Sequence, residues 1–429
     1  MKILVSADLH LGKQSSNMKI GEMESSVTFT WHRITDHVIE NRMDALVLAG
    51  DIIDRDNRFF EAIGPVQKAF DKLDAAGIPV VMVSGNHDFD VLPDIIRNRN
   101  YDHVHLLGEK GRWESKIIDT QNGRLQFLGW SFPLQHVMED PLVQLLDYDL
   151  DLDPNLPTVG LLHGDLFDRK SHYAPLDQAG FPVGIAQAWV IGHIHKPEII
   201  KKRDPLILYP GSPQALSPKE TGPHGPFLLS IEGKNADAHQ VPLSPVRYEQ
   251  LQIDITDAEN ESEFRNRVTR GLFDDVRDRV EELVMVTHMV YDILLTGRHS
   301  SMRNLENWSG LADEFESEII TETVAKVRKI VNDADPTVEN LEELATQPTP
   351  PGILAKVILD LESEKSSQFL EELISELKDT IGNVNRSRTY QSLNRFDEHL
   401  PESDETARKL LLRESRHLLG ELISQKAEG

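Results

Sequence analysis

Residues 78–88 read IPVVMVSGNHD, and this stretch shows how the chain is built. An apolar, β-branched run ends at Val83, and the polar cluster Gly85-Asn86-His87-Asp88 follows almost at once. A run of this length and composition is typical of a buried strand. In α/β proteins, ligands bind beyond the carboxyl ends of such strands. The stretch therefore predicts a strand that delivers polar side chains to a site.

Four further clusters repeat this pattern after the apolar runs KILVSA, MDALVLA, TVGLL and QAWVI. They are Asp8-Leu9-His10, Gly50-Asp51-Ile52-Ile53-Asp54, His163-Gly164-Asp165 and Gly192-His193-Ile194-His195. A single Asp-x-His or His-x-His is more often a turn or a polar pair, so the prediction depends on the order of all five clusters. Oxygen and imidazole donors without thiolates suit divalent metals such as manganese, iron or zinc. The clusters predict a dinuclear metal site, which would clamp the attacking and leaving oxygens at phosphorus.

The order D-x-H, G-D-x-x-D, G-N-H-D, H-G-D, G-H-x-H resembles that of the calcineurin-like metallophosphoesterases. The stretches ILVSADLHLG, VLAGDIIDR, VSGNHD and YPGSPQALSPKE resemble more narrowly the SbcD-type DNA double-strand-break repair nucleases, the partners of an SMC-like ATPase. These motifs cover roughly the first 220 residues. The resemblance implies a DNA exonuclease and endonuclease that hydrolyses phosphodiester bonds with two divalent metal ions, Mn²⁺ being the metal expected.

The resemblance also implies a role for each residue of the clusters. Asp51 would bridge the two metals; Asp8, His10 and His195 would complete the first metal site, and Asn86, His163 and His193 the second. His87 would face the phosphate instead, where it could protonate the leaving alcohol or stabilise charge. Each ligand histidine needs a partner on its other ring nitrogen, and Asp88 and Asp165 are candidates for that role.

Asp54 and Arg55 leave a second function open. The eukaryotic and archaeal relatives carry His at the position of Asp54, whereas the bacterial form and the phosphoprotein phosphatases carry Asp. In the phosphatases an arginine follows and grips phosphate, so a phosphoprotein phosphatase or cyclic-nucleotide phosphodiesterase is the alternative. Asp165 in the fourth cluster and the paired histidines of the fifth favour the nuclease. If these two residues do not act on phosphate, Asp54 would orient a metal ligand and Arg55 would lie at the surface.

A third possibility is a scaffold protein whose metals are only structural. His87 argues against it, because a purely structural site does not need a histidine beyond its ligands. The set of candidate residues therefore favours an enzyme.

The spacing of apolar residues predicts helices over 27–42 and 61–76, between the first three strands. This order predicts a βαβαβ unit with a parallel sheet. Seven later strands, from HVHLLG to PFLLSIEG, have no regular helices between them and are expected to form a second sheet. The predicted fold is an α/β, two-sheet metallophosphoesterase sandwich flanked by helices, over residues 1–245.

Two further regions are expected after the sandwich. Residues 246–335 are predicted to form a small α+β capping domain, and residues 336–429 a linker, signalled by Pro348-Thr349-Pro350-Pro351, and a helical C-terminal region. The helices would either bury their own apolar stripe or dock onto the coiled coil of a partner. The resemblance favours docking to the ATPase and implies a homodimer within a heterotetramer. Arg386, Arg388 and Arg395 form a local basic run that could also touch DNA.

The composition restricts these predictions. The chain has 71 acidic and 45 basic residues, a net charge of -26, whereas a DNA-binding protein usually carries a basic footprint. Three explanations would reconcile the acidic charge with the predicted function: bound metals reverse the local field, the ATPase holds the DNA, or the substrate is not DNA. The second explanation is preferred. Absence of cysteine excludes disulfides and thiolate metal sites. Because no apolar run reaches the ~20 residues needed to span a membrane, a cytoplasmic protein is expected.

Overall fold

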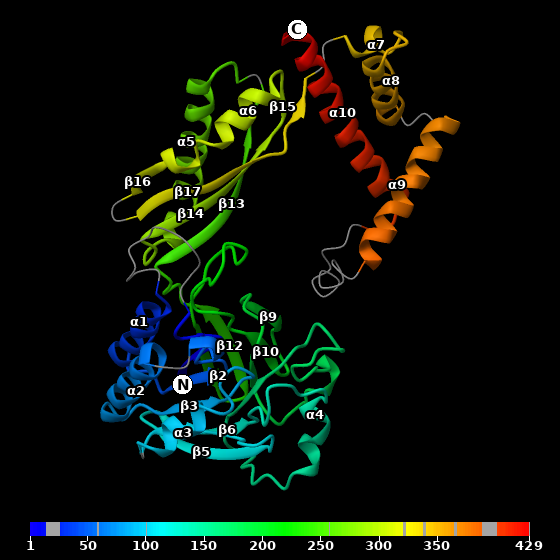
Figure 1. The fold of residues 1–429 in the computed structure, drawn as a ribbon. Coiled ribbons are helices and arrows are strands. Elements are labelled where there is room, and N and C mark those ends of the chain that lie inside the picture. The colour runs from blue at the N-terminus through cyan, green and yellow to red at the C-terminus, as the bar shows by residue number, and fades with distance from the viewer. Residues whose placement is uncertain are drawn as a thin grey trace. The chain divides into compact units, whose positions relative to one another are not determined.

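The first part of the chain alternates strands and helices. The computed structural model describes residues 1–13, 26–57, 60–99, 101–256, 258–320, 323–337, 340–363, 367–387 and 401–428. It begins with β1 (Lys2–Ser6), α1 (Val27–Glu40), β2 (Ala45–Ala49), α2 (Phe60–Ala75), β3 (Val80–Val83), α3 (Leu92–Arg97) and β4 (Val104–Leu106). The four strands are parallel neighbours, which confirms the predicted βαβαβ unit (Figure 1).

A second sheet follows. Its strands are β5 (Glu114–Thr120), β6 (Gly123–Gly129), β7 (Thr158–His163), β8 (Ala188–Gly192), β9 (Glu198–Lys201) and β10 (Leu206–Tyr209), with the short helix α4 (Pro141–Gln144) between β6 and β7. The order across the sheet is β5-β6-β7-β8-β10-β9, and the four central strands are parallel. The carboxyl ends of β7 and β8 therefore lie side by side.

Two strands expected in the second sheet belong to the first, so that part of the prediction is wrong. The HVHLLG strand is β4, which pairs with β3. The PFLLSIEG strand is β11 (Phe227–Glu232), which runs antiparallel to β1 and is followed by β12 (Asn235–Gln240). The first sheet has the order β12-β11-β1-β2-β3-β4. An apolar run does not specify its neighbour, because pairs such as Leu4 and Leu228 are far apart in the sequence.

The two sheets pack face to face around one core. Side chains such as Ile3 and Val47 from the first sheet meet Phe127 and Val190 from the second. The opposite face of the first sheet is covered by α1, α2 and α3, with Trp31 fully buried there. Strands buried on both faces explain the continuous apolar runs in the sequence. The predicted two-sheet α/β sandwich is confirmed.

The later elements form two small sheets and several helices. The strands are β13 (Val246–Asp254), β14 (His288–Thr296), β16 (Glu316–Ile320) and β17 (Thr323–Asn332), in the order β13-β14-β17-β16, with β15 (Arg298–His299) beside β18 (Asp335–Pro336). The helices are α5 (Glu261–Asp278), α6 (Met302–Ser309), α7 (Leu341–Leu344), α8 (Pro350–Glu362), α9 (Gln368–Arg386) and α10 (Asp404–Glu428).

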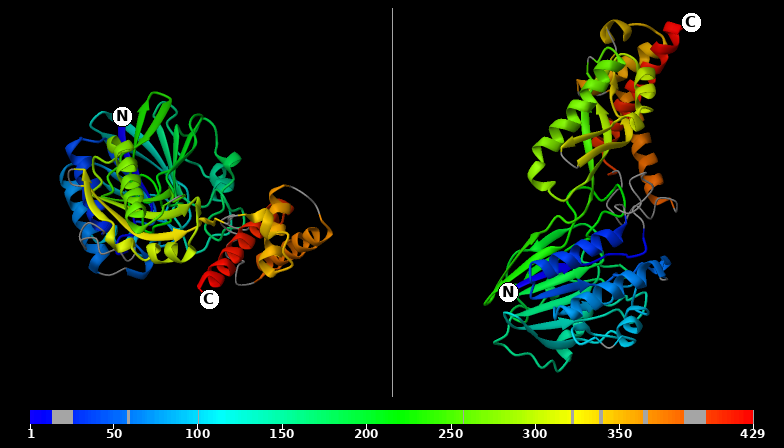
Figure 2. Two further views of the ribbon diagram at one scale, coloured as in Figure 1. Left: turned by 90° about the horizontal axis from the view of Figure 1, so that it is seen from above. Right: turned by 90° about the vertical axis from the view of Figure 1, so that its left-hand side faces the viewer.

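The proline-rich stretch starts a helix, whereas a linker was expected. The hydroxyl of Thr349 accepts from the N–H of Gly352, and Pro350 and Pro351 occupy the first turn of α8. Proline is tolerated there because the first N–H groups of a helix have no intrahelical acceptor. The helices α8, α9 and α10 then pack together around Leu361 and Ala407, in orange to red in Figures 1 and 2.

The chain forms two compact units. The first comprises residues 1–249, 276–290 and 317–326, and the second comprises residues 250–275, 291–316 and 327–429. The domain boundaries near residues 245 and 335 stay predictions. Arg388 and Arg395 of the basic run lie outside the described residues. Within the described part of the chain, no helix is both long and apolar enough to cross a bilayer.

Candidate metal centre

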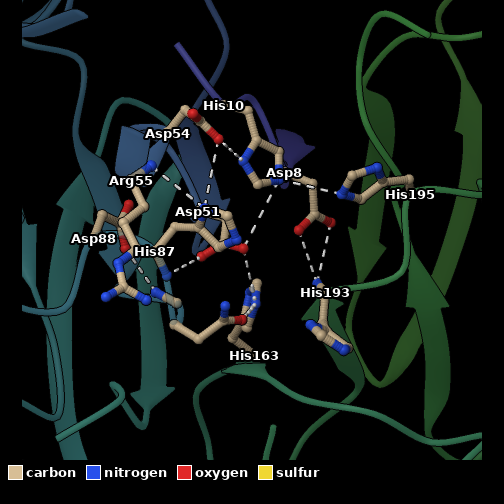
Figure 3. Close-up of polar contacts among 12 residues, drawn as sticks. Asp8, His10, Asp51, Asp54, Arg55, His87, Asp88, His163, His193 and His195 are labelled. Carbon is tan, nitrogen blue, oxygen red and sulfur yellow. Dashed lines mark hydrogen bonds and ion pairs between the residues drawn. The ribbon is translucent and has the colours of Figure 1, made fainter. Parts of the chain in front are cut away.

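The five polar clusters meet at one rim of the sandwich, because each follows a parallel strand whose carboxyl end points there (Figure 3). Four of their residues have left-handed backbone conformations: Asp8, His10, Asp51 and His193 have φ of 50°, 48°, 51° and 99°. Such conformations are costly for residues other than glycine, and they concentrate at functional sites. The chain thus turns sharply at the positions where these side chains must converge.

The first group of donors consists of Asp8, His10 and His195. One ligand atom from each lies within 4.8 Å of the others, and the Nε2 atoms of the two histidines are 3.1 Å apart. Two ring nitrogens at that distance repel unless a proton or a cation lies at their lone pairs. The donor set therefore fits a divalent metal of the kind that imidazole and carboxylate bind.

Asp51 lies between this group and the second (Figure 3). Its Oδ2 is 3.8 Å from Nε2 of His10 and 3.4 Å from Nε2 of His163. Its other oxygen, Oδ1, accepts from the backbone N–H of His87 at 2.9 Å. Although burial opposes ionisation, the neighbouring histidines, His163 foremost, hold the pKa of Asp51 well below its usual range. Oδ2 of Asp51 therefore lies between the ring nitrogens of His10 and His163.

The second group is centred on His163. Its Nε2 is 3.1 Å from Oδ1 of Asn86, and its Nδ1 is 3.0 Å from the carbonyl oxygen of Ala49. Since a carbonyl only accepts, Nδ1 carries the hydrogen and Nε2 faces the centre. Burial disfavours a protonated ring, but Asp51 and Asp8 raise the pKa of His163 to about 9. In the metal-free protein this ligand nitrogen therefore holds a proton.

His193 lies beside the second group. Its ring centroid is 5.4 Å from that of His163, and its backbone N–H donates to the carboxylate of Asp8 at 2.9 Å. Burial and the neighbouring His163 lower the pKa of His193 to about 3. The ring is therefore neutral at physiological pH, which is the form that binds metal.

Asp54 connects His10 with His87. Its Oδ1 is 3.3 Å from Nδ1 of His10 and 3.5 Å from Nδ1 of His87. Burial opposes protonation of His87, but Asp54 and Asp51 outweigh it and raise the pKa of the ring. The side chain of Arg55 is exposed, and its backbone N–H donates to Nδ1 of His87, at 3.4 Å. This arrangement matches the interpretation of Asp54 as an orienting residue.

Asp88 does not face a histidine ring, although the sequence made it a candidate for that role. Its carboxylate accepts from the N–H groups of Ile52 at 2.7 Å and Gly85 at 2.8 Å, and so ties the loop after β2 to the loop after β3. Burial and the charge of Asp51 raise the pKa of Asp88 to about 6. Asp165 does face a ligand, since its Oδ2 is 3.8 Å from Nε2 of His193.

Glu220 is a site residue that the sequence reasoning missed. Its Oε1 is 3.4 Å from Nδ1 of His195, while its Oε2 accepts from the hydroxyl of Ser212 at 3.0 Å and the N–H of Leu216 at 2.9 Å. Despite burial, His195 lowers the pKa of Glu220 to about 2. The signal was present, because Glu220 ends the stretch YPGSPQALSPKE. A carboxylate behind a ligand histidine is a common way to fix its tautomer.

Comparisons with known proteins place the chain among phosphoesterases. The chain is 26% identical over 262 residues to the uncharacterized metallophosphoesterase YhaO of Bacillus subtilis, covering 59% of this chain and 63% of the relative. It is 27% identical over 291 residues to the DNA double-strand break repair protein Mre11 of Methanopyrus kandleri, covering 63% of each. It is 25% identical over 258 residues to a subunit of the nuclease SbcCD from Bacillus subtilis, covering 52% of this chain and 64% of the relative.

The chain spans only about 63% of the length of the first two relatives. Residues 1–197, which belong to the sandwich, match the model of the calcineurin-like phosphoesterase family. These residues include all seven candidate metal ligands and His87. Residues 1–197 therefore form a calcineurin-like metallophosphoesterase domain, a fold that implies bound divalent metal ions.

Proposed function

We propose that this protein is a DNA nuclease that hydrolyses phosphodiester bonds with two metal ions, in the repair of double-strand breaks. The observation that carries the proposal is the convergence of two donor groups on Oδ2 of Asp51, with His87 beside them. Support for DNA as the substrate comes from the relatives named as Mre11 and as part of the nuclease SbcCD. The choice of Mn²⁺ comes from the family resemblance, and the mixed oxygen and imidazole donors suit manganese, iron or zinc alike.

When bound, two divalent cations lower the pKa of water and stabilise the attacking and leaving oxygens at phosphorus. The protein's own contribution is to hold the donors in place. Asp8, His10 and His195 would bind one cation and Asn86, His163 and His193 the other, with Asp51 shared. The backbone hydrogen bond from His193 to Asp8 ties the two groups together.

His87 is placed to act as the acid. Its Nδ1 faces Asp54, whose charge raises the pKa of the ring and so favours the protonated form. The Nε2 nitrogen would then donate its proton to the leaving oxygen of the substrate. Asp54 holds both this ring and the ring of His10, so one carboxylate sets the distance between the acid and a metal ligand.

A phosphoprotein phosphatase or cyclic-nucleotide phosphodiesterase remains the alternative, because Asp54-Arg55 also fits it and the YhaO relative carries only the name of a metallophosphoesterase. The deciding assay compares the rates on duplex DNA with free ends, DNA hairpins, a phosphoserine peptide and a cyclic nucleotide, each with Mn²⁺ and with a chelator. The nuclease proposal expects DNA to be the preferred substrate. Turnover of the peptide or the cyclic nucleotide that greatly exceeds turnover of DNA would favour the alternative.

The same assay tests His87. His87→Asn should lower kcat by roughly 10²- to 10⁴-fold, the usual contribution of a general acid, with Mn²⁺ affinity retained. His239→Asn, at an exposed histidine of β12, is the matched control and should behave as wild type. Full activity of His87→Asn would contradict the mechanism.

The partners are also proposed. The name of the SbcCD relative describes one part of a complex, which supports an SMC-like ATPase partner and, with the DNA substrate, a homodimer within a heterotetramer in the cytoplasm. The helices α8, α9 and α10 bury one apolar face among themselves, while Ile353, Phe369 and Leu418 stay about half exposed. These exposed side chains are the proposed contacts for a coiled coil. Co-purification with the product of an adjacent gene that encodes a long coiled-coil ATPase tests this proposal.

A further inference from the structure

An exposed aromatic loop follows the fourth metal cluster. Residues 165–173 read DLFDRKSHY, and the side chain of Phe167 is 58% exposed. Its ring stacks on that of Tyr209, with centroids 5.9 Å apart and planes 29° from parallel. The hydroxyl of Tyr209 donates to the carbonyl of Gly164 and accepts from the N–H of Leu166, at 2.8 and 3.0 Å. Phe167 is therefore held in place by one ring and keeps much of its surface toward solvent.

This loop is fixed to the metal centre. The N–H groups of Phe167 and Asp168 donate to Oδ1 of Asp165, at 2.9 and 3.0 Å. The other oxygen of Asp165 is 3.8 Å from Nε2 of the candidate ligand His193. The carboxylate of Asp165 thus contacts both the backbone of this loop and the candidate ligand His193.

A second group of rings lines the same centre. The ring of Tyr173 is 5.1 Å from that of His193, and the ring of His136 is 5.5 Å from Tyr173 and 6.1 Å from His172. His136 and His172 are exposed. Backbone hydrogen bonds join Val137 to residues 172 and 174, at 2.9 and 2.8 Å, and hold the two segments together. The rings therefore form a surface supported by backbone pairing.

The loop carries two basic residues, Arg169 and Lys170, and two acidic residues, Asp165 and Asp168. Lys170 is exposed, and the side chain of Arg169 is 79% exposed and pairs with Asp177 at 3.2 Å. Single exposed apolar residues are common and need no explanation. Here, however, the exposed rings of Phe167 and His172 flank Arg169 and Lys170 in the loop that follows the fourth cluster. Proteins that bind single-stranded nucleic acid combine these two features, because bases stack on aromatic rings while cations follow the backbone.

We infer that this aromatic loop, made of residues 165–173 with His136, binds the bases of an unpaired strand beside the metal centre. The inference rests on the proposed nuclease function and narrows its substrate to DNA whose end is unpaired or opened. Phe167 offers an exposed ring for one base, and His136 and His172 border the path of the strand. Loss of one stacking ring should weaken binding of a single strand by about tenfold to a hundredfold.

The test pairs a change in the protein with a change in the DNA. Duplexes with a thymidine overhang are compared with duplexes whose overhang has the same backbone but no bases, using wild type and Phe167→Ala. Wild type should degrade the thymidine end at least about tenfold faster than the abasic end. Phe167→Ala should slow only the thymidine end, so that the two ends become equal. Met138→Ala, at an apolar residue 61% exposed in the neighbouring segment, should keep the wild-type preference.

One further measurement, together with these rates, separates the possible outcomes. The Mn²⁺ affinity of Phe167→Ala, measured by calorimetry, should equal that of wild type, which shows that the metal centre is intact. DNA turnover that is unaffected by the loss of bases, or a preference that survives in Phe167→Ala, overturns this inference and leaves the nuclease function standing. Absence of any DNA turnover by wild type overturns the proposed function and the inference together. If Phe167→Ala and Met138→Ala lost the preference for the thymidine end equally, the contact would be apolar without base stacking. That result would also overturn the inference.

Discussion

Three histidines of the metal centre have an oxygen atom beside Nδ1 and direct Nε2 inward. The oxygen comes from a backbone carbonyl for His163, from Asp54 for His10 and from Glu220 for His195. Since the group at Nδ1 decides which nitrogen is available to a metal, these contacts determine the donor set as much as the histidines themselves do. The sequence offered Asp54 as an orienting residue, but it gave no sign of the carbonyl of Ala49 or of the role of Glu220.

Glu220→Gln tests the contribution of such a partner. The amide keeps the shape of the side chain but loses the charge that polarises His195, so Mn²⁺ affinity should fall by about 10- to 100-fold. Isothermal calorimetry on the metal-free protein measures the change. Glu232→Gln, at an exposed glutamate that ends β11, should bind Mn²⁺ as wild type does. An unchanged affinity for Glu220→Gln would show that Glu220 does not support the ligand.

Metal binding should depend on pH through His163. Its pKa is raised to about 9 in the metal-free protein, so below that pH the incoming cation must displace a proton. With one proton released, the apparent affinity for Mn²⁺ should rise about tenfold per pH unit between pH 6 and 8. Calorimetry in buffers of different ionisation enthalpy should detect the released proton. An affinity independent of pH over that interval, with no proton release, would contradict this account.

At the scale of elements, the carboxyl ends of β2 and β8 approach each other so closely that no side chain fits between them. A Cβ on Gly192 would lie 2.0 Å from the carbonyl oxygen of Ala49 and 2.6 Å from Nδ1 of His163. A Cβ on Gly85 would lie 2.1 Å from Oδ1 of Asp51. The glycines in the clusters therefore let strands from two different sheets bring their ligands into one centre.

Gly192→Ala should separate these strand ends. The added methyl group meets backbone and a buried ring, neither of which can move cheaply, so both thermal stability and Mn²⁺ affinity should fall. Gly64→Ala in α2 is the control, since a Cβ there meets nothing within 4 Å. Because alanine favours a helix, that control should be neutral or stabilising by about 0.4–1 kcal/mol. Thermal unfolding and calorimetry measure both effects, and a Gly192→Ala protein with wild-type values would disprove the close approach.

For the whole molecule, the charge balance bears on the source of DNA affinity. The net charge of -26 opposes association with a polyanion. Basic residues such as Arg169 and Lys170 are exposed near the metal centre, but they are few against the total. The isolated chain can therefore supply only a small part of the electrostatic term that dominates nucleic-acid binding.

The isolated chain is expected to bind duplex DNA no more tightly than roughly 10⁻⁶ M at physiological salt, the tight end of ordinary non-specific binding. Fluorescence anisotropy with Ca²⁺ in place of Mn²⁺, over a series of salt concentrations, measures this affinity. The slope of affinity against salt should be small, because few phosphates are neutralised. Nanomolar binding by the chain alone would show that no partner is needed to bring the DNA.

The sequence by itself determined the strands, the sharp turns after them and the residue types in the five clusters, because each of these is specified within about ten neighbouring residues. Only the tertiary structure decided that β4 and β11 join the first sheet, that Asp88 ties two loops, and that Glu220 supports His195. These are pairings between segments far apart in the chain. No local pattern encodes them, since they depend on which strand ends the folded core brings together.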